Sequence, residues 1–99
     1  MAELVDLPAG RQARELNIKI MYYVYSIKSL SKKYIYIGLT NNYKRRIEEH
    51  QKGKEKTTRP YRPFKILLIE KFDTRIQARA REKYLKSGSG KEWIKSNFN

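Results

Sequence analysis

Apolar side chains recur along this chain in patterns that predict three β-strands. From Ile18 to Ser29, large apolar residues occupy both faces of an extended segment, which predicts a central strand covered on both sides. Alternation from Tyr34 to Leu39 predicts a second strand after a short link at Leu30–Lys33. A continuous apolar run within Phe64–Phe72 predicts the third strand.

The first two strands are expected to form an antiparallel hairpin. With the reversal centred between Leu30 and Ser31, Tyr25 lies directly opposite Tyr36. Antiparallel partners directly opposite share a face, with Cβ atoms about 5 Å apart, so the two rings are expected side by side. The link lacks the Asn-Gly or Asp-Gly of a tight primed turn, and a wider loop with the same centre keeps the pairing.

Spacings of three and four residues predict a helix after the second strand. The three residues Thr40, Asn41 and Asn42 are all competent N-caps, and the helix is expected to end near Lys52, before Gly53. One stripe of this helix is expected to face inward with polar tips, and it consists of Tyr43, Arg46, Ile47 and His50.

Two further helices are predicted after the third strand. A capping box at Thr74–Gln77 opens a helix to about Lys86. Its neighbouring rows are Ile76, Ala80 and Tyr84 on one side and Ala78, Glu82 and Leu85 on the other. A second capping box at Ser89–Glu92 predicts a short last helix that docks Trp93 and Ile94.

This order of elements predicts an α/β fold, in detail an α+β sandwich. A three-stranded antiparallel sheet is flanked by helices over residues 18–99, with no internal repeat and no second domain. Residues 1–17 are expected to be a flexible or loosely docked N-terminal arm, because so short a segment is marginal as an isolated helix.

Charge narrows the class of partner. The 99 residues suit one domain, and 23 Lys and Arg against 10 acids give a formal charge of +13. Such a field attracts polyanions, with nucleic acid as the first expected partner and anionic membrane or acidic protein as the alternatives.

The absence of cysteine excludes disulfides and thiolate metal sites. No apolar run has the length of a membrane span or the character of a signal peptide, so we expect a cytoplasmic protein without a membrane partner. We also expect a monomer, or at most a weak dimer.

One ordered set of residues combines two short strand motifs with three polar helix residues: Tyr23-Val24-Tyr25, Tyr36-Ile37-Gly38, Arg46, His50 and Glu82. This set resembles the GIY-YIG nuclease domain. The resemblance covers roughly Met21 to Asn97 and is to the small, stand-alone type of domain. The chain departs from the family pattern in lacking the first motif's glycine and in carrying Leu39 where some members have lysine; Asn97 is the one candidate for a late asparagine.

The resemblance implies a role for each of these residues. Tyr25 would contact and activate a water with His50 as its partner, and cations beside Tyr25 would have to lower its pKa of about 10 for it to act as a base. Tyr36 would orient water or phosphate, Arg46 would hold a phosphate bidentately, and Glu82 would bind Mg²⁺ or Mn²⁺. From the residues alone other readings stay open: strand packing for the tyrosines, a surface cation or a salt bridge for Arg46, a structural histidine, and an ordinary helix glutamate.

The functional prediction is a metal-dependent endonuclease that hydrolyses DNA with low sequence specificity, in a setting such as repair or recombination. Branched or damaged DNA is one expected substrate, and RNA stays open. Basic residues expected to contact backbone phosphates are Arg45, Lys52, Lys54, Lys56, Arg59 and Arg62. The competing hypotheses are a catalytically weak or inactive nucleic-acid-binding module of the same fold and a basic structural or protein-interaction domain.

Overall fold

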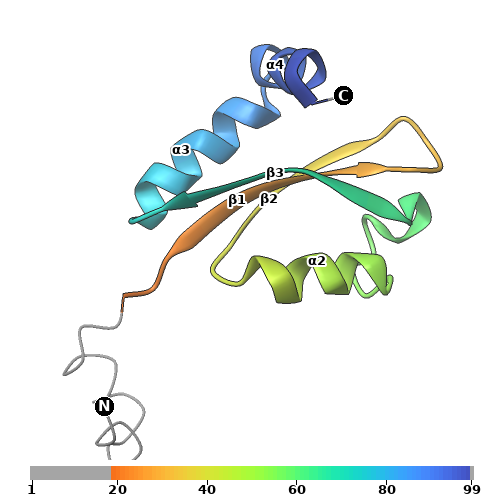
Figure 1. Cartoon of the computed structure of the whole chain (residues 1–99), viewed down its shortest axis with the longest axis horizontal. Coiled ribbons are helices and arrows are strands. Elements are labelled where there is room, and N and C mark those ends of the chain that lie inside the picture. The colour runs from red at the N-terminus through yellow and green to blue at the C-terminus, as the bar shows by residue number, and fades with distance from the viewer. Residues whose placement is uncertain (1–18, 99) are drawn as a thin grey trace, which may run out of the picture.

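A three-stranded antiparallel sheet separates two helical layers (Figure 1). The structure is a computed structural model that describes residues 19–98, so the predicted N-terminal arm lies outside it. The elements in order are β1 (Tyr22–Ser29), β2 (Ile35–Thr40), α2 (Tyr43–Gln51), the 3₁₀ turn η2 (Arg59–Tyr61), β3 (Phe64–Phe72), α3 (Arg75–Lys86) and α4 (Gly88–Phe98). No helix within residues 19–98 has the length and apolar character needed to cross a bilayer. The predicted fold class is confirmed.

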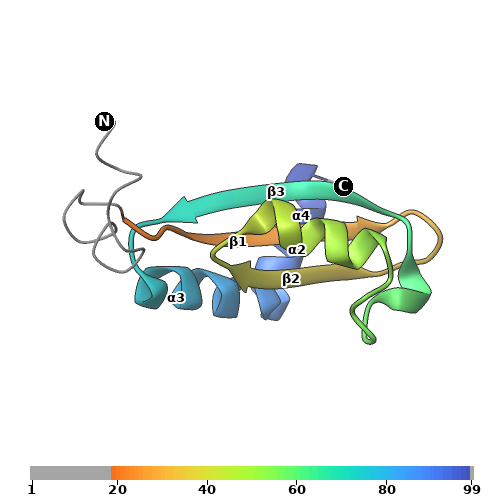
Figure 2. The ribbon, with the colours of Figure 1, turned by 90° about the horizontal axis from the view of Figure 1, so that it is seen from below.

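β1 is the central strand, as the sequence predicts, because the sheet order is β2-β1-β3. The strand begins at Tyr22, four residues later than expected. α2 covers one face of the sheet, and α3 and α4 cover the other (Figure 1). Seen from the α2 side, α3 extends beyond the β2 edge (Figure 2).

The predicted register of the β1–β2 hairpin is wrong, because the centre of the reversal lies one position further along the chain than expected. Tyr25 pairs with Gly38, and Tyr36 pairs with Ile27, so the reversal is centred between Ser31 and Lys32. The Ser29 side chain explains the shift, because its Oγ accepts hydrogen bonds from the backbone N–H groups of Ser31 (3.1 Å) and Lys32 (3.0 Å). Each partner moves by two residues, which keeps Tyr25 and Tyr36 on one face.

The continuous apolar run of β3 results from a β-bulge. Ser26 pairs with Leu68 and Ile27 pairs with Ile66, so Leu67 is an extra residue. Leu67 and Leu68 both pack toward α3 and α4, whereas Ile69 packs toward α2. A two-faced strand with a bulge therefore has no clean alternation.

Each face of the sheet has its own core. Tyr25, Ile27, Ile47 and Phe64 are buried on the α2 side. On the other side the buried residues are Val24, Ile37, Ala78, Leu85 and Ile94. Burial of large apolar side chains, at roughly 1.5–3 kcal/mol each, holds both helical layers to the sheet.

The helix termini follow the predicted caps in two cases of three. Asn42 accepts from the Arg45 N–H at 3.1 Å, and Thr74 accepts from the Gln77 N–H at 3.2 Å. The predicted box at Ser89 is wrong: Ser87 Oγ accepts from the Gly90 N–H at 3.1 Å, so α4 starts at Gly88.

Of the two predicted rows of α3, only one is buried. Ala78, Glu82 and Leu85 face the sheet. Ile76 and Tyr84 of the other row are exposed. Glu82 therefore lies on the buried face of its helix.

Candidate active site

Five side chains from two strands, a helix and a loop meet on the α2 side of the sheet. We call them the α2-side cluster: Tyr25, Tyr36, Arg46, His50 and Thr58. The predicted inward stripe of α2 is confirmed, because Ile47 and His50 are buried. The Tyr36 ring lies 6.1 Å from that of Tyr25 and 4.9 Å from the His50 ring, measured between centroids. Four of the five predicted catalytic residues are thus brought together.

A buried chain of hydrogen bonds runs through the cluster. The Tyr25 hydroxyl lies 2.8 Å from His50 Nε2, and His50 Nδ1 lies 2.8 Å from Thr58 Oγ1. All three residues are at most 1% exposed. Polar groups removed from water to this extent are costly unless paired, so each group holds the next in place.

The direction of these hydrogen bonds follows from the last group in the chain. The Glu55 carbonyl oxygen lies 3.5 Å from Thr58 Oγ1 and can accept its proton, so we assign the Thr58 lone pairs to accept from His50 Nδ1–H. His50 Nε2 then carries a lone pair that accepts the Tyr25 hydroxyl proton. The imidazole is neutral near pH 7, because burial, assisted by the charge of Arg46, lowers the His50 pKa.

The Tyr25 phenol keeps its proton in the free protein. Burial raises its pKa well above the usual value, and the neighbouring Tyr36 adds to the rise. The charge of Arg46 and its hydrogen bond act in the opposite direction. The expectation that a nearby cation lowers the Tyr25 pKa is therefore not met by Arg46 alone, because desolvation outweighs it.

Gly38 makes room for the Tyr25 ring. Tyr25 and Gly38 are direct cross-strand partners, and a Cβ at position 38 would overlap the Tyr25 hydroxyl and Cζ. Any other residue would push the phenol away from His50. The site therefore requires glycine at the end of Tyr36-Ile37-Gly38, because a larger residue would occupy the space of the Tyr25 ring.

Two carboxylates surround Arg46. Its guanidinium donates to Glu49 at 3.0 Å and to Glu55 at 2.8 Å, and it is 26% exposed. Hydrogen bonding to Glu55 and Glu49 raises the Arg46 pKa, and the same contacts lower the pKa of both acids. Arg46 can reach a phosphate from solvent, but a phosphate has to compete with these carboxylates.

The loop after α2 supplies the parts of the site that the sequence patterns missed. Gly53, at φ 77°, ends the helix, and its N–H donates to the His50 carbonyl at 3.1 Å while the Lys54 N–H donates to the Glu49 carbonyl at 2.9 Å. The chain then folds back and places Glu55 against Arg46 and Thr58 against His50. A glycine at the helix end is the signal for this reversal, but no spacing rule identifies the residue that reaches the histidine.

Glu82, the predicted metal ligand, lies in the helical layer on the other face of the sheet. It is 7% exposed, and its oxygens pair with Arg79 at 3.2 Å and with Lys86 at 3.1 Å. Within the described residues no hydrogen bond or ion pair joins it to the α2-side cluster, and no group of three acidic or histidine side chains gathers to hold a metal. One carboxylate still fits Mg²⁺, which keeps several waters and takes other oxygens from substrate phosphate.

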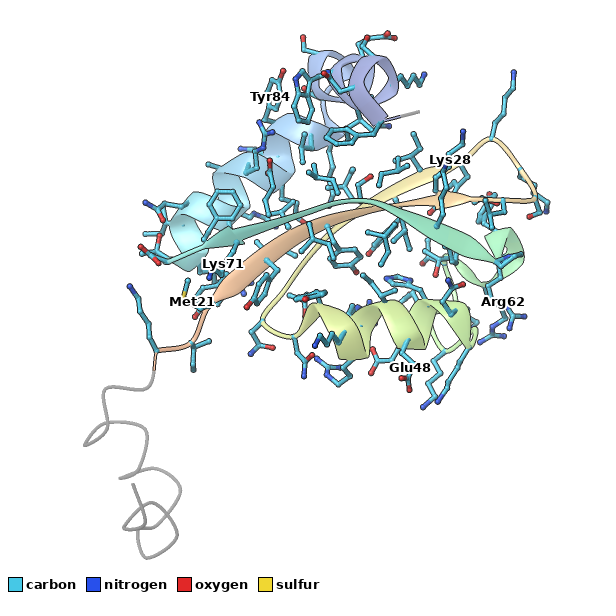
Figure 3. The ribbon with its side chains drawn as sticks, viewed as in Figure 1. Met21, Lys28, Glu48, Arg62, Lys71 and Tyr84 are labelled. Carbon is cyan, nitrogen blue, oxygen red and sulfur yellow. The ribbon has the colours of Figure 1, made fainter. Side chains whose placement is uncertain are left out.

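The six predicted phosphate-contacting residues are all exposed, on α2 and the following loop. Arg45 and Lys52 make ion pairs along α2, with Glu49 at 2.8 Å and Glu48 at 2.9 Å. Arg59 donates to the Gly53 carbonyl at 2.8 Å, and Arg62 donates to that of Arg59 at 3.1 Å. Figure 3 shows Glu48 and Arg62 on the α2 side of the sheet.

Comparison with known proteins places the chain in a family. The model of the GIY-YIG catalytic domain matches residues 21–97. This chain belongs to the GIY-YIG family. A UPF0213 protein of Clostridium perfringens is 39% identical over 67 residues, covering 67% of this chain and 71% of the relative. A UPF0213 protein of Natronomonas pharaonis is 37% identical over 67 residues, covering 67% and 78%. No solved structure matches.

Membership in the GIY-YIG family makes this a nuclease-type domain. The two motif segments lie side by side on β1 and β2, and Tyr25 and Tyr36 point to the same face. The first motif's missing glycine leaves Tyr23 in its place, and the Tyr23 ring packs on Tyr43 of α2 at 4.9 Å between centroids. The degenerate motif therefore keeps its tyrosine in position.

Proposed function

We propose that this chain is a metal-dependent endonuclease that hydrolyses phosphodiester bonds in DNA with low sequence specificity. The observation that carries the proposal is the Tyr25–His50–Thr58 hydrogen-bond chain beside Arg46. It offers a proton acceptor and a cation at one place, which hydrolysis of a phosphodiester requires. The formal charge of +13 would draw DNA to the surface.

The proton path runs from water to histidine. Tyr25 is buried in the free protein, so the attacking water would have to reach its oxygen together with the bound phosphate; it would then give a proton to the Tyr25 oxygen while the Tyr25 hydroxyl proton moves to His50 Nε2. The new P–O bond forms as the bond to the leaving sugar oxygen breaks, and that oxygen takes its proton from solvent. Tyr25 ends neutral and His50 ends as imidazolium, so a phenolate never has to persist.

Arg46 and Glu82 supply charge. Arg46 would exchange its carboxylate partners for non-bridging phosphate oxygens, which its planar guanidinium matches. By the family pattern Glu82 would hold Mg²⁺ or Mn²⁺, which would supply positive charge to a DNA phosphate on its own face of the sheet; at the α2-side cluster the positive charge is that of Arg46. Exposed Arg79 and Lys86 now pair with Glu82, and both can turn toward solvent when an ion takes their place.

A nicking assay tests the proposal. Supercoiled and branched DNA are incubated with the protein and Mg²⁺ or Mn²⁺, with chelator as the metal-free control. Glu82→Ala and Arg46→Ala are expected to abolish cleavage, whereas Asp73→Asn and Lys44→Ala, exposed changes of the same charges, are expected to keep it. Cleavage undiminished in both site variants would reject the proposal. DNA binding that persists in chelator, with no nicking under either metal, would identify a binding module of the same fold.

A further inference from the structure

A lysine-lined pocket lies on the face of the sheet away from the α2-side cluster. Its volume is about 540 Å³, and its walls come from β1, the β1–β2 link, β2 and α4: Lys28, Lys33, Tyr34, Ile35, Lys91 and Lys95. Ile35 packs into the core beneath α3 and α4, which fixes the side of the sheet. Figure 3 shows Lys28 on that same side, toward α4.

The local placement of these lysines is unfavourable for the free protein. Lys91 and Lys95 are four residues apart on α4, and like charges at that spacing repel. Lys91 also lies near the N-terminus of α4, where the helix dipole disfavours a cation. A bound anion would relieve both of these unfavourable interactions.

Carboxylates do not neutralise most of this pocket. Among the described residues, no ion pair or hydrogen bond engages the side chains of Lys33, Lys91 or Lys95, and no acidic side chain lines the walls. This differs from α2, where Arg45, Arg46 and Lys52 all pair with glutamates.

We propose that the four-lysine pocket binds the phosphate backbone of a second segment of the DNA, outside the stretch that meets the α2-side cluster. The inference deepens the proposed function and rests on it for the identity of the polyanion. Tyr34 links the two faces, because it lines the pocket and its ring stacks on Tyr61 of η2 with centroids 3.8 Å apart. Arg59 and Arg62 flank Tyr61, so basic residues continue around the hairpin end from one face to the other. A backbone contact of this kind adds affinity without sequence choice.

The test measures salt-dependent DNA binding in chelator, where no cleavage takes place. One variant carries Lys33→Gln, Lys91→Gln and Lys95→Gln. The matched control carries Lys44→Gln, Lys71→Gln and Lys83→Gln, exposed lysines outside the pocket and the cluster that remove the same charge. Each lost phosphate contact reduces the magnitude of the slope of log affinity against log salt by about 1. This slope is therefore expected to fall by about 2–3 in the pocket variant and by less than 1 in the control.

A second measurement uses the unmodified protein: DNA is expected to protect Lys33, Lys91 and Lys95 from acylation more than Lys44, Lys71 and Lys83. Equal losses in the two variants, or equal protection of the two sets, would overturn the inference. A pocket variant that loses binding to phosphatidylserine vesicles or to tripolyphosphate, but not to DNA, would also overturn it.

The nicking assay and the binding measurement test the two proposals separately. A chain that never cuts DNA but shows the pocket effect disproves the hydrolysis alone, and one that cuts DNA without the effect disproves the pocket alone.

Discussion

Removing the Thr58 hydroxyl tests whether the hydrogen-bond chain sets the proton path. Thr58→Val keeps the shape of a fully buried side chain and leaves His50 Nδ1–H without its 2.8 Å partner. A buried donor without a partner costs about 1–3 kcal/mol. For a domain of this size that lowers the Tm by at least about 4 °C.

The imidazole can escape this cost by moving its proton to Nε2. That tautomer donates toward the Tyr25 oxygen and can no longer accept its proton. Nicking by Thr58→Val is therefore expected to fall about 100-fold, the lower end of what a positioned base contributes. Thr58 acts through His50, so it is a positioning residue rather than a catalytic one.

Three measurements separate this effect from simple loss of structure. ¹⁵N chemical shifts of His50 in the metal-free protein report which nitrogen carries the proton, independently of activity. Thr58→Ser restores the hydroxyl and is expected to restore both the tautomer and the nicking. Thr57→Val, at the exposed neighbouring threonine, is the control. Thr58→Val with the Tm, tautomer and nicking of Thr57→Val would refute the reasoning.

Three further predictions concern the same cluster. Gly38→Ala is expected to displace the Tyr25 phenol, destabilise the fold by about 1–3 kcal/mol and stop nicking. Gly88→Ala, whose added Cβ meets open space, is expected to keep both the stability and the nicking of the unchanged protein, as measured by denaturation and nicking assays. Because the His50 pKa is lowered in the folded state, the unfolded chain takes up a proton first as the pH falls below about 6.5, so stability measured in urea decreases there, and His50→Asn is expected to abolish that decrease. Glu55→Gln frees one side of Arg46 and is expected to tighten DNA binding severalfold in chelator; unchanged or weaker binding would contradict competition between carboxylate and phosphate.

Sequence periodicity was sufficient to predict the sheet, the helices and, for β1, β2 and α2, which residues share a face. Tyr25, Tyr36 and the inward stripe of α2 follow from period-2 and period-3.6 patterns, which the backbone imposes whatever the loops do. The exact register was not predictable in the same way, because a single side chain, Ser29, organises the turn through local hydrogen bonds. A shift of two residues kept the shared face, so Tyr25 and Tyr36 still point to the α2 side, whereas Glu82 lies on the other face of the sheet.

The irregular parts of the site were beyond pattern reasoning. Thr58 and Glu55 lie in a loop whose path depends on the Gly53 reversal and on packing against α2. The raised pKa of Tyr25 depends on burial, and burial is known only when α2 and the sheet are assembled. Sequence identified the charges near the phenol but not the desolvation that outweighs them.

The electrostatics of the cluster decide which group receives the proton. Burial already holds the Tyr25 pKa above its usual value in spite of Arg46. In the proposed mechanism a phosphate takes the place of the carboxylates at Arg46, and its negative charge beside the phenol would again disfavour a free phenolate. The neutral His50 nitrogen, 2.8 Å away, is in contrast made more basic by the same negative charge. In the proposed mechanism, proton transfer through the tyrosine to the histidine would thus become easier when a phosphate binds. In the proposed mechanism, the geometry and charge of this site therefore favour a tyrosine that passes the proton to the imidazole over a tyrosine that acts as a base in its own right.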